Sequence, residues 1–451
     1  MYLLYSLLTA AGILLLSPYF LIRGLLQGKY LDNLPERLGW KFPPELRAQS
    51  LAAAQPKTIW IHAVSVGEVL AALPLAKQLK DRYPARRLVI STTTNTGQQL
   101  ARERMQFADA IFYFPLDWAG PVRRALSATQ PSVVLIVETE IWPNFLRECR
   151  RATVPVIFVN GRLSQRSYTG FLRAIAYSGG LLRGFLKKIL NDASLFLMQG
   201  AEDAERLLAL GAPKDRVLVT GNLKYDLALP AETPLSAWLA PELARAQRAP
   251  VLIAGSVMAN EEPLVLGAFA AVEREFPGAL LILAPRKPDQ FNNAAAIISQ
   301  AGRPLVRRSE ISLNGSSANP LAKSGNVFLL DSLGELAALY RLADAVFVGG
   351  SLVPVGGHNI LEPAAFGKVP VYGPFMDNFR EIAEAFHDAG ASIRVATSQE
   401  LGAAWLGLLR DPQRAACMGA AARDLVDRNQ GATRRVLTHM EKFLDAPGGL
   451  P

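Results

Sequence analysis

Short apolar runs alternate with longer stretches of helical periodicity along most of the chain. This alternation predicts βαβ units, in which crossover helices join the parallel strands of one sheet. The candidate strands are 58–63, 88–92, 110–114, 133–137, 156–160, 195–199 and 217–220, and then 251–254, 280–283, 327–330, 345–348 and 369–372. The expected fold class is therefore α/β, with two Rossmann-like domains facing a central cleft.

An Ala- and Pro-rich stretch separates the two series of strands. We interpret this stretch, residues 229–249, as a linker between an N-terminal domain at 23–228 and a C-terminal domain at 250–425. Residues 426–451 are expected to form a helix and a tail, for which packing back on the N-terminal domain is left open. At about 150 residues per domain, a chain of 451 residues has room for two or three such units.

Composition limits the kinds of partner. The 48 Lys and Arg residues outnumber the 39 Asp and Glu residues, and the net charge of +9 favours partners that carry phosphate or form an anionic surface. The only two cysteines, Cys149 and Cys417, cannot build a disulfide framework or a cysteine zinc cluster, which indicates a reducing compartment.

The first 22 residues contain no charged side chain, and Arg23 ends this run. As a helix the run would be about 33 Å long, against about 30 Å for the hydrocarbon core of a bilayer. Basic residues follow the run, whereas they precede the apolar part of a cleaved signal peptide. We therefore expect a transmembrane anchor at 1–22, with the rest of the chain on the cytoplasmic side. A buried core helix is the alternative.

Acidic residues follow two of the predicted strands, where open α/β sheets bind their ligands. Glu68 opens a helix after the first strand, where it could satisfy free backbone amides or act as a general base toward a hydroxyl. A low pKa would accompany the first role, because the helix dipole favours the carboxylate. Glu138 and Glu140 follow the fourth strand and are interpreted either as paired acidic sites or as a structural pair.

A basic and aromatic segment follows the fifth strand, over residues 162–189. Its basic side chains interleave with aromatic and aliphatic ones near helical spacing, a pattern that fits nucleic acid, anionic lipid or an ordinary amphipathic helix. Beside a membrane anchor we favour a lipid surface, and we expect no nucleic acid. The side chains predicted for that surface are Arg162, Arg166, Arg173, Lys187 and Lys188.

The second domain carries the pattern of an anion-binding site. Arg286 follows a predicted strand, where a guanidinium can clamp a phosphate. The run VGGSLVPVGGHNILEP at 348–363 places four glycines before a helix expected to begin at Asn359, so that free amides would meet an anionic ligand. Glu362 in that helix could accept a hydrogen bond from a ribose hydroxyl. A tight turn without a ligand is the alternative.

Motifs of metal-dependent and hydrolytic chemistry are missing from the sequence. There is no Asp-x-Asp motif, no GxxxxGK[ST] loop and no Gly-x-Ser-x-Gly motif, and the four histidines show no metal-ligand spacing. We therefore expect no metal and no cofactor. Arg286 and the helix at Asn359 would then meet the charge of a leaving group.

Two Rossmann-like domains with these sites suggest a nucleotide-sugar transferase of the two-domain B type. The motifs HAVSVGEV, VETEIWPN, NGRLS, GNLKYD, APRKP and VGGHNILEPAAFGKVPVYGP occur in this order after RLGW at 37–40. As a set they closely resemble those of the Kdo transferases, which are CMP-3-deoxy-D-manno-octulosonate:lipid A precursor glycosyltransferases. The resemblance covers nearly the whole chain.

The resemblance implies a reaction and roles for single residues. Kdo would move from CMP-Kdo to a hydroxyl of the lipid A precursor with inversion, without metal or cofactor, at the inner membrane, in lipopolysaccharide biosynthesis. Glu68 would be the general base, and Glu138 and Lys224 would stabilise the transition state. CMP would be bound by Pro285, Arg286, Gly334, Glu335, Leu336, Asn359, Ile360, Leu361 and Glu362, with Gly255, Ser256 and Gly357 as further donor contacts.

Two other kinds of function stay open from the sequence. Another B-type enzyme, such as a UDP-N-acetylglucosamine epimerase or transferase, would bind uridine rather than cytidine nucleotides. A membrane-tethered glycolipid binder that has lost catalysis would be expected to have lost site residues first, but Glu68, Glu138, Lys224 and Arg286 are all present.

Overall fold

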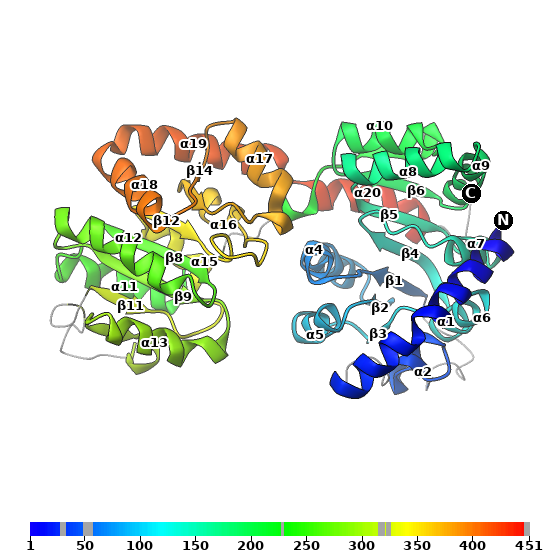
Figure 1. Ribbon diagram of the computed structural model, residues 1–451, viewed down its shortest axis with the longest axis horizontal. Coiled ribbons are helices and arrows are strands. Elements are labelled where there is room, and N and C mark those ends of the chain that lie inside the picture. Colours follow the sequence, from blue (N-terminus) through cyan, green and yellow to red (C-terminus); the bar gives the residue numbers. More distant parts are fainter. Residues whose placement is uncertain (28–32, 48–56, 227–229, 314–320, 322–325, 446–451) are drawn as a thin grey trace. The chain divides into compact units, whose positions relative to one another are not determined.

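The computed structural model describes residues 1–27, 33–47, 57–226, 230–313, 321 and 326–445, with the side chains of residues 16–27 excepted. The chain forms two compact units, each built around one parallel sheet (Figure 1). The N-terminal unit is Met1–Asp226 with Asn429–Pro451, and the C-terminal unit is Leu227–Arg428. The domain boundary predicted at residue 228 lies outside the described residues. The predicted α/β fold class is confirmed.

Seven parallel strands form the sheet of the N-terminal unit, in the order β3-β2-β1-β4-β5-β6-β7. All seven lie where the apolar runs predict them. They are β1 (Thr58–His62), β2 (Arg87–Thr92), β3 (Ala110–Tyr113), β4 (Pro131–Val137), β5 (Val156–Gly161), β6 (Leu195–Met198) and β7 (Val217–Val219). The central strands are buried because helices cover both faces of a parallel sheet.

Helices α6, α7 and α9 pack on one face of this sheet, in a core that includes Phe112, Phe145 and Phe158. Helices α4 and α20 pack on the other face, around Leu75, Leu79 and the side chains of Ile59 and Ile61 on β1. Besides the N-terminal helix α1 (Tyr2–Gln27), the described helices of the unit are α2 (Leu34–Arg37), α3 (Pro44–Arg47), α4 (Val66–Arg82), α5 (Asn95–Arg104), α6 (Ala119–Thr129), α7 (Pro143–Arg151), α8 (Gln165–Tyr177), α9 (Leu181–Leu190), α10 (Ala201–Ala209) and α20 (Ala432–Leu444).

The last helix, α20, belongs to the N-terminal unit although it is the C-terminal end of the described chain. Val436 and Met440 are fully buried in the core of that unit. The carboxylate of Asp226 accepts hydrogen bonds from the amides of Gly431 (2.6 Å) and Thr433 at the start of the helix. These hydrogen bonds hold the start of α20 next to Asp226, the residue at which the first segment of the N-terminal unit ends.

The sheet of the C-terminal unit also has seven parallel strands, in the order β10-β11-β9-β8-β12-β13-β14. They are β8 (Val251–Val257), β9 (Leu280–Pro285), β10 (Leu305–Arg307), β11 (Val327–Leu329), β12 (Ala345–Val348), β13 (Pro370–Tyr372) and β14 (Ile393–Arg394). The two edge strands, β10 and β14, were not predicted. Each has only two or three residues and ends in an arginine, so neither gives a continuous apolar run.

The stretch predicted as a linker, 229–249, contains helix α11 (Pro234–Arg245). The helix begins at a capping box, in which the Thr233 hydroxyl accepts from the Ser236 amide at 3.1 Å, and Leu239 on its inner face is fully buried. The Ala and Pro content is therefore that of a capped amphipathic helix. The other helices of the unit are α12 (Glu262–Glu275), α13 (Phe291–Gln300), α15 (Leu336–Leu339), α16 (Leu361–Ala365), α17 (Arg380–Asp388), α18 (Ser398–Arg410) and α19 (Pro412–Asn429).

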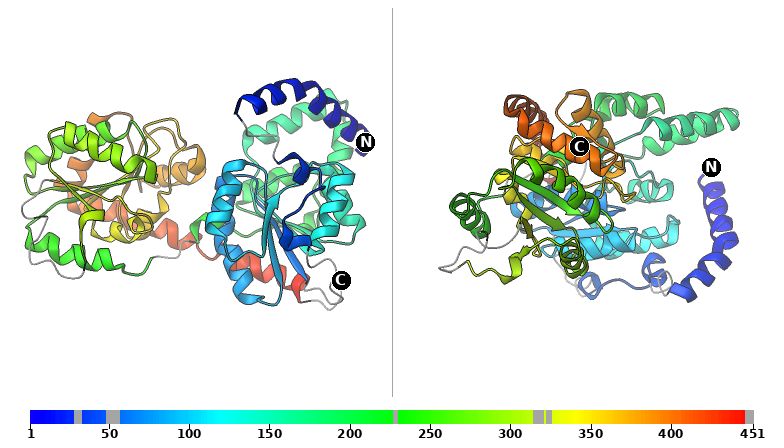
Figure 2. Two further views of the ribbon diagram at one scale, coloured as in Figure 1. Left: turned by 90° about the horizontal axis from the view of Figure 1, so that it is seen from below. Right: turned by 60° about the vertical axis from the view of Figure 1, so that its left-hand side comes forward.

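The apolar N-terminus forms helix α1 (Tyr2–Gln27), which runs along the outside of the N-terminal unit (Figures 1 and 2). The Tyr2 hydroxyl donates to the Asp192 carboxylate at 2.6 Å, and the Trp118 indole donates to the Thr9 hydroxyl at 3.2 Å. The sequence predicts a membrane-spanning helix at 1–22. Among the described residues, no helix combines the length and the hydropathy that crossing a membrane requires.

Candidate active site

Acidic side chains gather at the carboxyl edge of the N-terminal sheet. Strands β1 and β4 are parallel neighbours, with His62 paired to Ile136 near their ends. The segments that follow these strands carry Glu68 and Glu138, and the charge of Glu138 raises the pKa of Glu68. The structure thus brings two of the three predicted catalytic side chains together.

Glu68 lies in the first turn of α4 and is 6% exposed. Its carboxylate accepts hydrogen bonds from the Val64 amide (2.7 Å) and the Ser65 hydroxyl (3.0 Å). Burial, and then the negative charges of Glu138 and Glu140, raise its pKa to about 8 in spite of these hydrogen bonds. The low pKa expected for a helix-capping carboxylate is therefore wrong, because desolvation and like-charge repulsion outweigh the capping contacts.

Glu138 and Glu140 occupy the turn that follows β4. The backbone of Glu138 is left-handed, with φ of +60°, and so is that of Asn160 on the neighbouring β5, with φ of +57°. Such a conformation costs a non-glycine residue on the order of 1 kcal/mol or more, and it recurs at functional sites. Burial, and then the charge of Glu138, raise the pKa of Glu140. This turn therefore concentrates negative charge beside Glu68.

Lys224 lies on a short 3-10 turn, Leu223–Tyr225, after β7. The Asn160 side chain accepts a hydrogen bond from the Leu223 amide at 2.9 Å, and the Asn222 side chain donates to Gln199 at 2.9 Å. These contacts hold the Lys224 turn at the ends of β5 and β6, on the carboxyl edge that carries the acids. Asn160 was not among the predicted site residues, although an asparagine before Gly161 at a strand end is a signal for a left-handed turn.

The five basic side chains predicted for a lipid surface divide into two groups. Arg166 and Arg173 on α8, and Lys187 and Lys188 on α9, are exposed on a helical hairpin that projects from the unit (Figure 2). Arg162 is only partly exposed and follows β5 at the carboxyl edge of the sheet.

In the C-terminal unit, Arg286 follows β9 and its charge reaches two side chains of the 348–363 segment. Burial, and then the Arg286 charge, lower the pKa of His358 to about 4. Burial raises the pKa of Glu362, while a hydrogen bond from Asn359 and the Arg286 charge oppose this rise. The structure thus brings Pro285, at the end of β9, and Arg286 together with Glu362. His358 is a member of this group that the sequence analysis did not assign.

The helix expected to begin at Asn359 begins at Leu361 and has only five residues. The Asn359 side chain accepts from the Leu361 amide at 3.1 Å and donates to Glu362 at 3.3 Å. Ile360 and Leu361 are fully buried, so their side chains belong to the core of the unit and not to an open surface. A helix of five residues has a much smaller dipole than a long one, so it gives little support to the expectation that its N-terminus meets the charge of a leaving group.

Gly334 and Glu335 precede α15, which begins at Leu336. Glu335 makes an ion pair with Arg308 (3.1 Å), a partner that the sequence analysis did not identify, and it accepts a hydrogen bond from the Ser332 hydroxyl. The Tyr340 hydroxyl lies over Gly255, where a Cβ atom would come within 2.0 Å of it. The absence of a side chain at Gly255 therefore has a packing reason. Ser256 follows it in a left-handed conformation, with φ of +55°.

Four amides of the glycine segment, which the sequence predicts to be free, are hydrogen-bonded within the unit. The amides of Gly350 (2.6 Å), Ser351 (3.0 Å) and Leu352 (2.8 Å) donate to the carboxylate of Glu261. The Gly357 amide donates to the Gly350 carbonyl at 2.7 Å. The expectation of an open anion site is wrong for these four amides, because groups of the chain itself already accept their hydrogen bonds.

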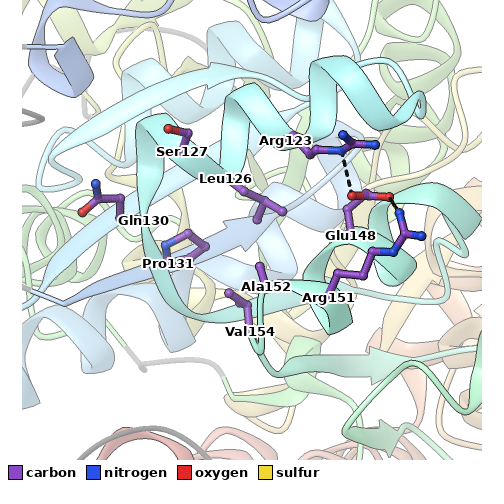
Figure 3. Close-up of a pocket in the computed structure, with 9 residues that line it drawn as sticks. All are labelled: Arg123, Leu126, Ser127, Gln130, Pro131, Glu148, Arg151, Ala152 and Val154. Carbon is purple, nitrogen blue, oxygen red and sulfur yellow. Dashed lines mark hydrogen bonds and ion pairs between the residues drawn. The ribbon is translucent and has the colours of Figure 1, made fainter.

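In the N-terminal unit, a pocket of about 540 Å³ lies at the amino ends of β4 and β5 between α6 and α7, at the edge of the sheet opposite to the one that carries Glu68 and Glu138 (Figure 3). Glu148 sits between Arg123 and Arg151, at 2.9 and 2.8 Å. None of the predicted site residues lines this pocket, and its two guanidinium groups are already paired with Glu148. The pocket therefore gives no support to a catalytic role at that edge of the sheet.

Comparison with known proteins identifies close relatives. Residues 32–227 match the family model of the 3-deoxy-D-manno-octulosonic-acid transferases. The 3-deoxy-D-manno-octulosonic acid transferase of Haemophilus influenzae is 33% identical over 92% of this chain and 92% of its own length. The corresponding protein of Bordetella pertussis is 35% identical over 86% of this chain and 87% of its own.

A solved structure shares the two-unit fold. A putative UDP-N-acetylglucosamine 2-epimerase from Listeria monocytogenes superposes with a TM-score of 0.52 at 15% identity, over 88% of this chain and 100% of that one. At this identity the likeness concerns the fold alone. The similarity to the two transferases extends over nearly the whole sequence, and it confirms the resemblance seen in the motifs. This chain belongs to the 3-deoxy-D-manno-octulosonic acid transferase family.

Proposed function

We propose that the protein transfers Kdo from CMP-Kdo to a hydroxyl of the lipid A precursor, with Glu68 as the general base. Membership of the family supports this reaction in lipopolysaccharide biosynthesis. The acceptor oxygen attacks the anomeric carbon of Kdo, its proton passes to Glu68, and the bond to CMP breaks with its electron pair on the phosphate. The configuration at the anomeric carbon is inverted.

The buried carboxylate of Glu68 is the observation that supports the base. A carboxylate with an ordinary pKa takes a proton from a hydroxyl poorly, and efficient general bases have a pKa near the working pH. Burial and the neighbouring acids raise the pKa of Glu68 to about 8. Glu138, whose charge contributes to this rise, and Lys224 are proposed to stabilise the transition state, with Lys224 near the Kdo carboxylate.

We assign the donor to the C-terminal unit, and Arg286 to the CMP phosphate. A guanidinium can pair with a phosphate through two hydrogen bonds and can balance the charge that develops as CMP leaves. Glu362, which the Arg286 charge reaches, and Asn359, which donates a hydrogen bond to Glu362, are proposed to bind ribose hydroxyls. Pro285, the Gly334–Leu336 turn and the backbone of Ile360 and Leu361 would complete the nucleotide site, with Gly255, Ser256 and Gly357 beside it.

The proposal is tested by incubating the detergent-solubilised full chain with freshly generated CMP-Kdo and tetraacyl lipid A precursor, followed by mass spectrometry of the lipid. We expect the precursor to gain the mass of one or more Kdo residues. Conversion of UDP-N-acetylglucosamine without Kdo transfer would instead favour an epimerase, whose fold the chain shares. Binding of CMP and of the precursor without any product would favour a non-catalytic binder.

We also propose that α1 and the α8–α9 hairpin attach the protein to the inner membrane. The face of α1 that carries Tyr2, Ser6 and Thr9 hydrogen-bonds to the N-terminal unit. The opposite face is 52% to 80% exposed and consists of Leu3, Leu4, Leu7, Leu8, Leu14 and Leu15. An ordinary surface helix turns its apolar face toward the protein and its polar face toward water, whereas α1 does the reverse. This arrangement is stable where the outer face of α1 meets apolar surroundings.

The α8–α9 hairpin supports the same attachment. Tyr177 and Leu181, at the tip between the two helices, are 92% and 72% exposed. The exposed Arg166 and Arg173 lie on α8, and the exposed Lys187 and Lys188 lie on α9, the two helices that this tip joins. The ring centroids of Phe185 on α9 and Tyr2 on α1 are 5.2 Å apart. An apolar surface beside basic side chains is what anionic phospholipid headgroups and their acyl chains recognise.

Vesicle flotation tests the attachment. Leu7→Asp with Leu8→Asp should abolish binding to vesicles with and without anionic lipid, because charged groups would replace the apolar face of α1. Arg173→Glu with Lys187→Glu should reduce binding to anionic vesicles only. Leu34→Asp, at a 42% exposed leucine of α2, is the control and should bind as the parent does. Unchanged binding of both double variants would contradict the attachment.

A further inference from the structure

Glu261 is a fully buried carboxylate that no catalytic role explains. It directly precedes α12, and its two oxygens accept hydrogen bonds from four backbone amides. One donor is local, the amide of Met258 at 2.9 Å. The other three are the consecutive amides of Gly350, Ser351 and Leu352, about 90 positions further along the chain, at 2.6 to 3.0 Å. The carboxylate thus joins the turn after β8 to the glycine segment after β12.

Helix capping alone does not account for this arrangement. Glu261 occupies the N-cap position of α12, but its side chain makes no capping hydrogen bond to that helix. A buried carboxylate is costly unless donors surround it, and charge-assisted hydrogen bonds from amides supply that compensation. Three successive amides that converge on one anion form the kind of nest that binds phosphate in other nucleotide-binding proteins. Here the anion is a side chain of the same unit.

The nest sets the shape of the segment that carries the proposed nucleotide-binding residues. The Gly350 amide donates to Glu261, and the Gly350 carbonyl accepts from the Gly357 amide at 2.7 Å. The ring of His358 lies against Gly350, where a Cβ atom would come within 2.7 Å of it. Asn359 directly follows His358 in the chain, and Glu362 lies four positions after His358. A shift of the Glu261 carboxylate would therefore move Gly350, and with it Gly357 and His358.

We propose that Glu261 is a positioning residue for the donor: it fills the amide nest of residues 350–352 and so holds the 349–362 segment in the shape that binds the nucleotide. The donor phosphate is then bound by Arg286 and not by these amides. This inference rests on the proposed assignment of the donor to the C-terminal unit. It also predicts that the nest keeps its internal anion when the nucleotide binds.

Hydrogen exchange in the unaltered full chain tests this point. The peptide that covers residues 349–355 should exchange slowly without nucleotide, because Glu261 holds three of its amides. Saturating CMP should slow exchange around Arg286 and leave these three amides unchanged. A marked further slowing of the three amides with CMP would overturn the inference, since the phosphate would then be their ligand. If CMP does not bind at all, the proposed function fails instead.

Variants give the second test, by steady-state kinetics and CMP titration. Glu261→Gln replaces one acceptor oxygen with an amide group that cannot accept, and we expect the KM for CMP-Kdo and the Kd for CMP to rise at least tenfold. Glu261→Asp keeps the charge and should recover part of this loss. Glu262→Gln is the matched control, because Glu262 is equally buried next to Glu261 and makes none of the described hydrogen bonds to residues 350–352; its KM should not change.

A purely structural role for Glu261 predicts a different result. The melting temperature of Glu261→Gln would fall, while the KM of the protein that remains folded would equal that of the parent. That outcome, or an equal rise of KM in Glu262→Gln, would overturn the inference. If Glu261→Gln does not fold, the comparison of Glu261→Asp with Glu262→Gln and the exchange experiment still decide.

Discussion

Glu68 and Glu140 in the N-terminal unit and Glu261 and Glu335 in the C-terminal unit have different surroundings. In the N-terminal unit, burial and mutual repulsion raise the pKa of Glu68 and Glu140 at one sheet edge. In the C-terminal unit, Glu261 is surrounded by backbone amides and Glu335 is paired with Arg308. A carboxylate whose negative charge is poorly compensated holds a proton tightly, which suits a base, whereas the hydrogen bonds of Glu261 hold a segment of backbone in place. Substitutions in the first unit should therefore change the chemistry, and those in the second should change binding.

The largest effect is expected at Glu68. Glu68→Gln keeps the side-chain volume but removes the proton acceptor, and we expect turnover to fall about 10²- to 10⁴-fold, the range ascribed to general bases. Binding of CMP should be unchanged, because the donor is assigned to the other unit. Kdo transfer followed by mass spectrometry, together with CMP titration, measures both. A rate near that of the parent would remove Glu68 from the base role.

Stability provides the control for this variant. The folded pKa of Glu68 is raised from 4.5 to about 8, so folding is favoured by the proton below pH 4.5 and loses this stabilisation as pH rises through 8. The amide of Glu68→Gln has no proton to lose, and its melting temperature should equal or exceed that of the parent above pH 8. The matched variant is Glu148→Gln, a buried carboxylate paired with two arginines at the opposite edge, which should lose stability but keep its turnover.

A smaller effect, chiefly on binding, is expected at Arg286. Arg286→Ala removes the charge assigned to the CMP phosphate, and a hydrogen bond to a charged group contributes about 1.5 to 3 kcal/mol. We expect the Kd for CMP to rise about 10- to 100-fold, with a fall in turnover as the leaving group loses its cation. Arg410→Ala, which breaks only the exposed pair with Glu275, is the control. Equal CMP affinity in Arg286→Ala and the parent would disprove the assignment.

The sequence predicts the fold well wherever buried strands and helices produce a recognisable pattern of apolar residues. All seven strands of the first sheet are apolar runs, and the central ones are covered on both faces, whereas the edge strand β7 is partly exposed. The edge strands β10 and β14 escape detection because a strand of two or three residues with one open side needs few apolar positions. Helix α11 escapes because its alanines and prolines look like a linker until the capping box at Thr233 and the buried Leu239 are considered together.

The sequence predicts which residue types lie at the candidate site, but not which residues form hydrogen bonds or charge interactions with them. Residues at strand ends were found because parallel strands end at one edge. The carboxylate of Glu261 was missed because its donors lie about 90 positions away, and no local pattern reports such a contact. The raised pKa of Glu68 was missed for the same reason: the local pattern shows a helix cap, whereas Glu138 and Glu140 come from another strand.

The smallest effect is expected on the pH dependence of the reaction, when the charges of Glu138 and Glu140 near Glu68 are removed. It tests directly whether these charges raise the pKa of Glu68. Removing a neighbouring negative charge favours the ionised form of Glu68 and lowers its pKa. The ascending limb of kcat/KM against pH should therefore move to lower pH in Glu140→Gln, by less than about one unit. It should move further in Glu138→Gln, because the Glu138 charge contributes more to the pKa of Glu68. Glu103→Gln removes an equal charge from an exposed position on α5 and should leave the limb in place. If the ascending limb stays at the same pH in all three variants, the titrating base is not Glu68. The contrast between the two units would then concern binding alone.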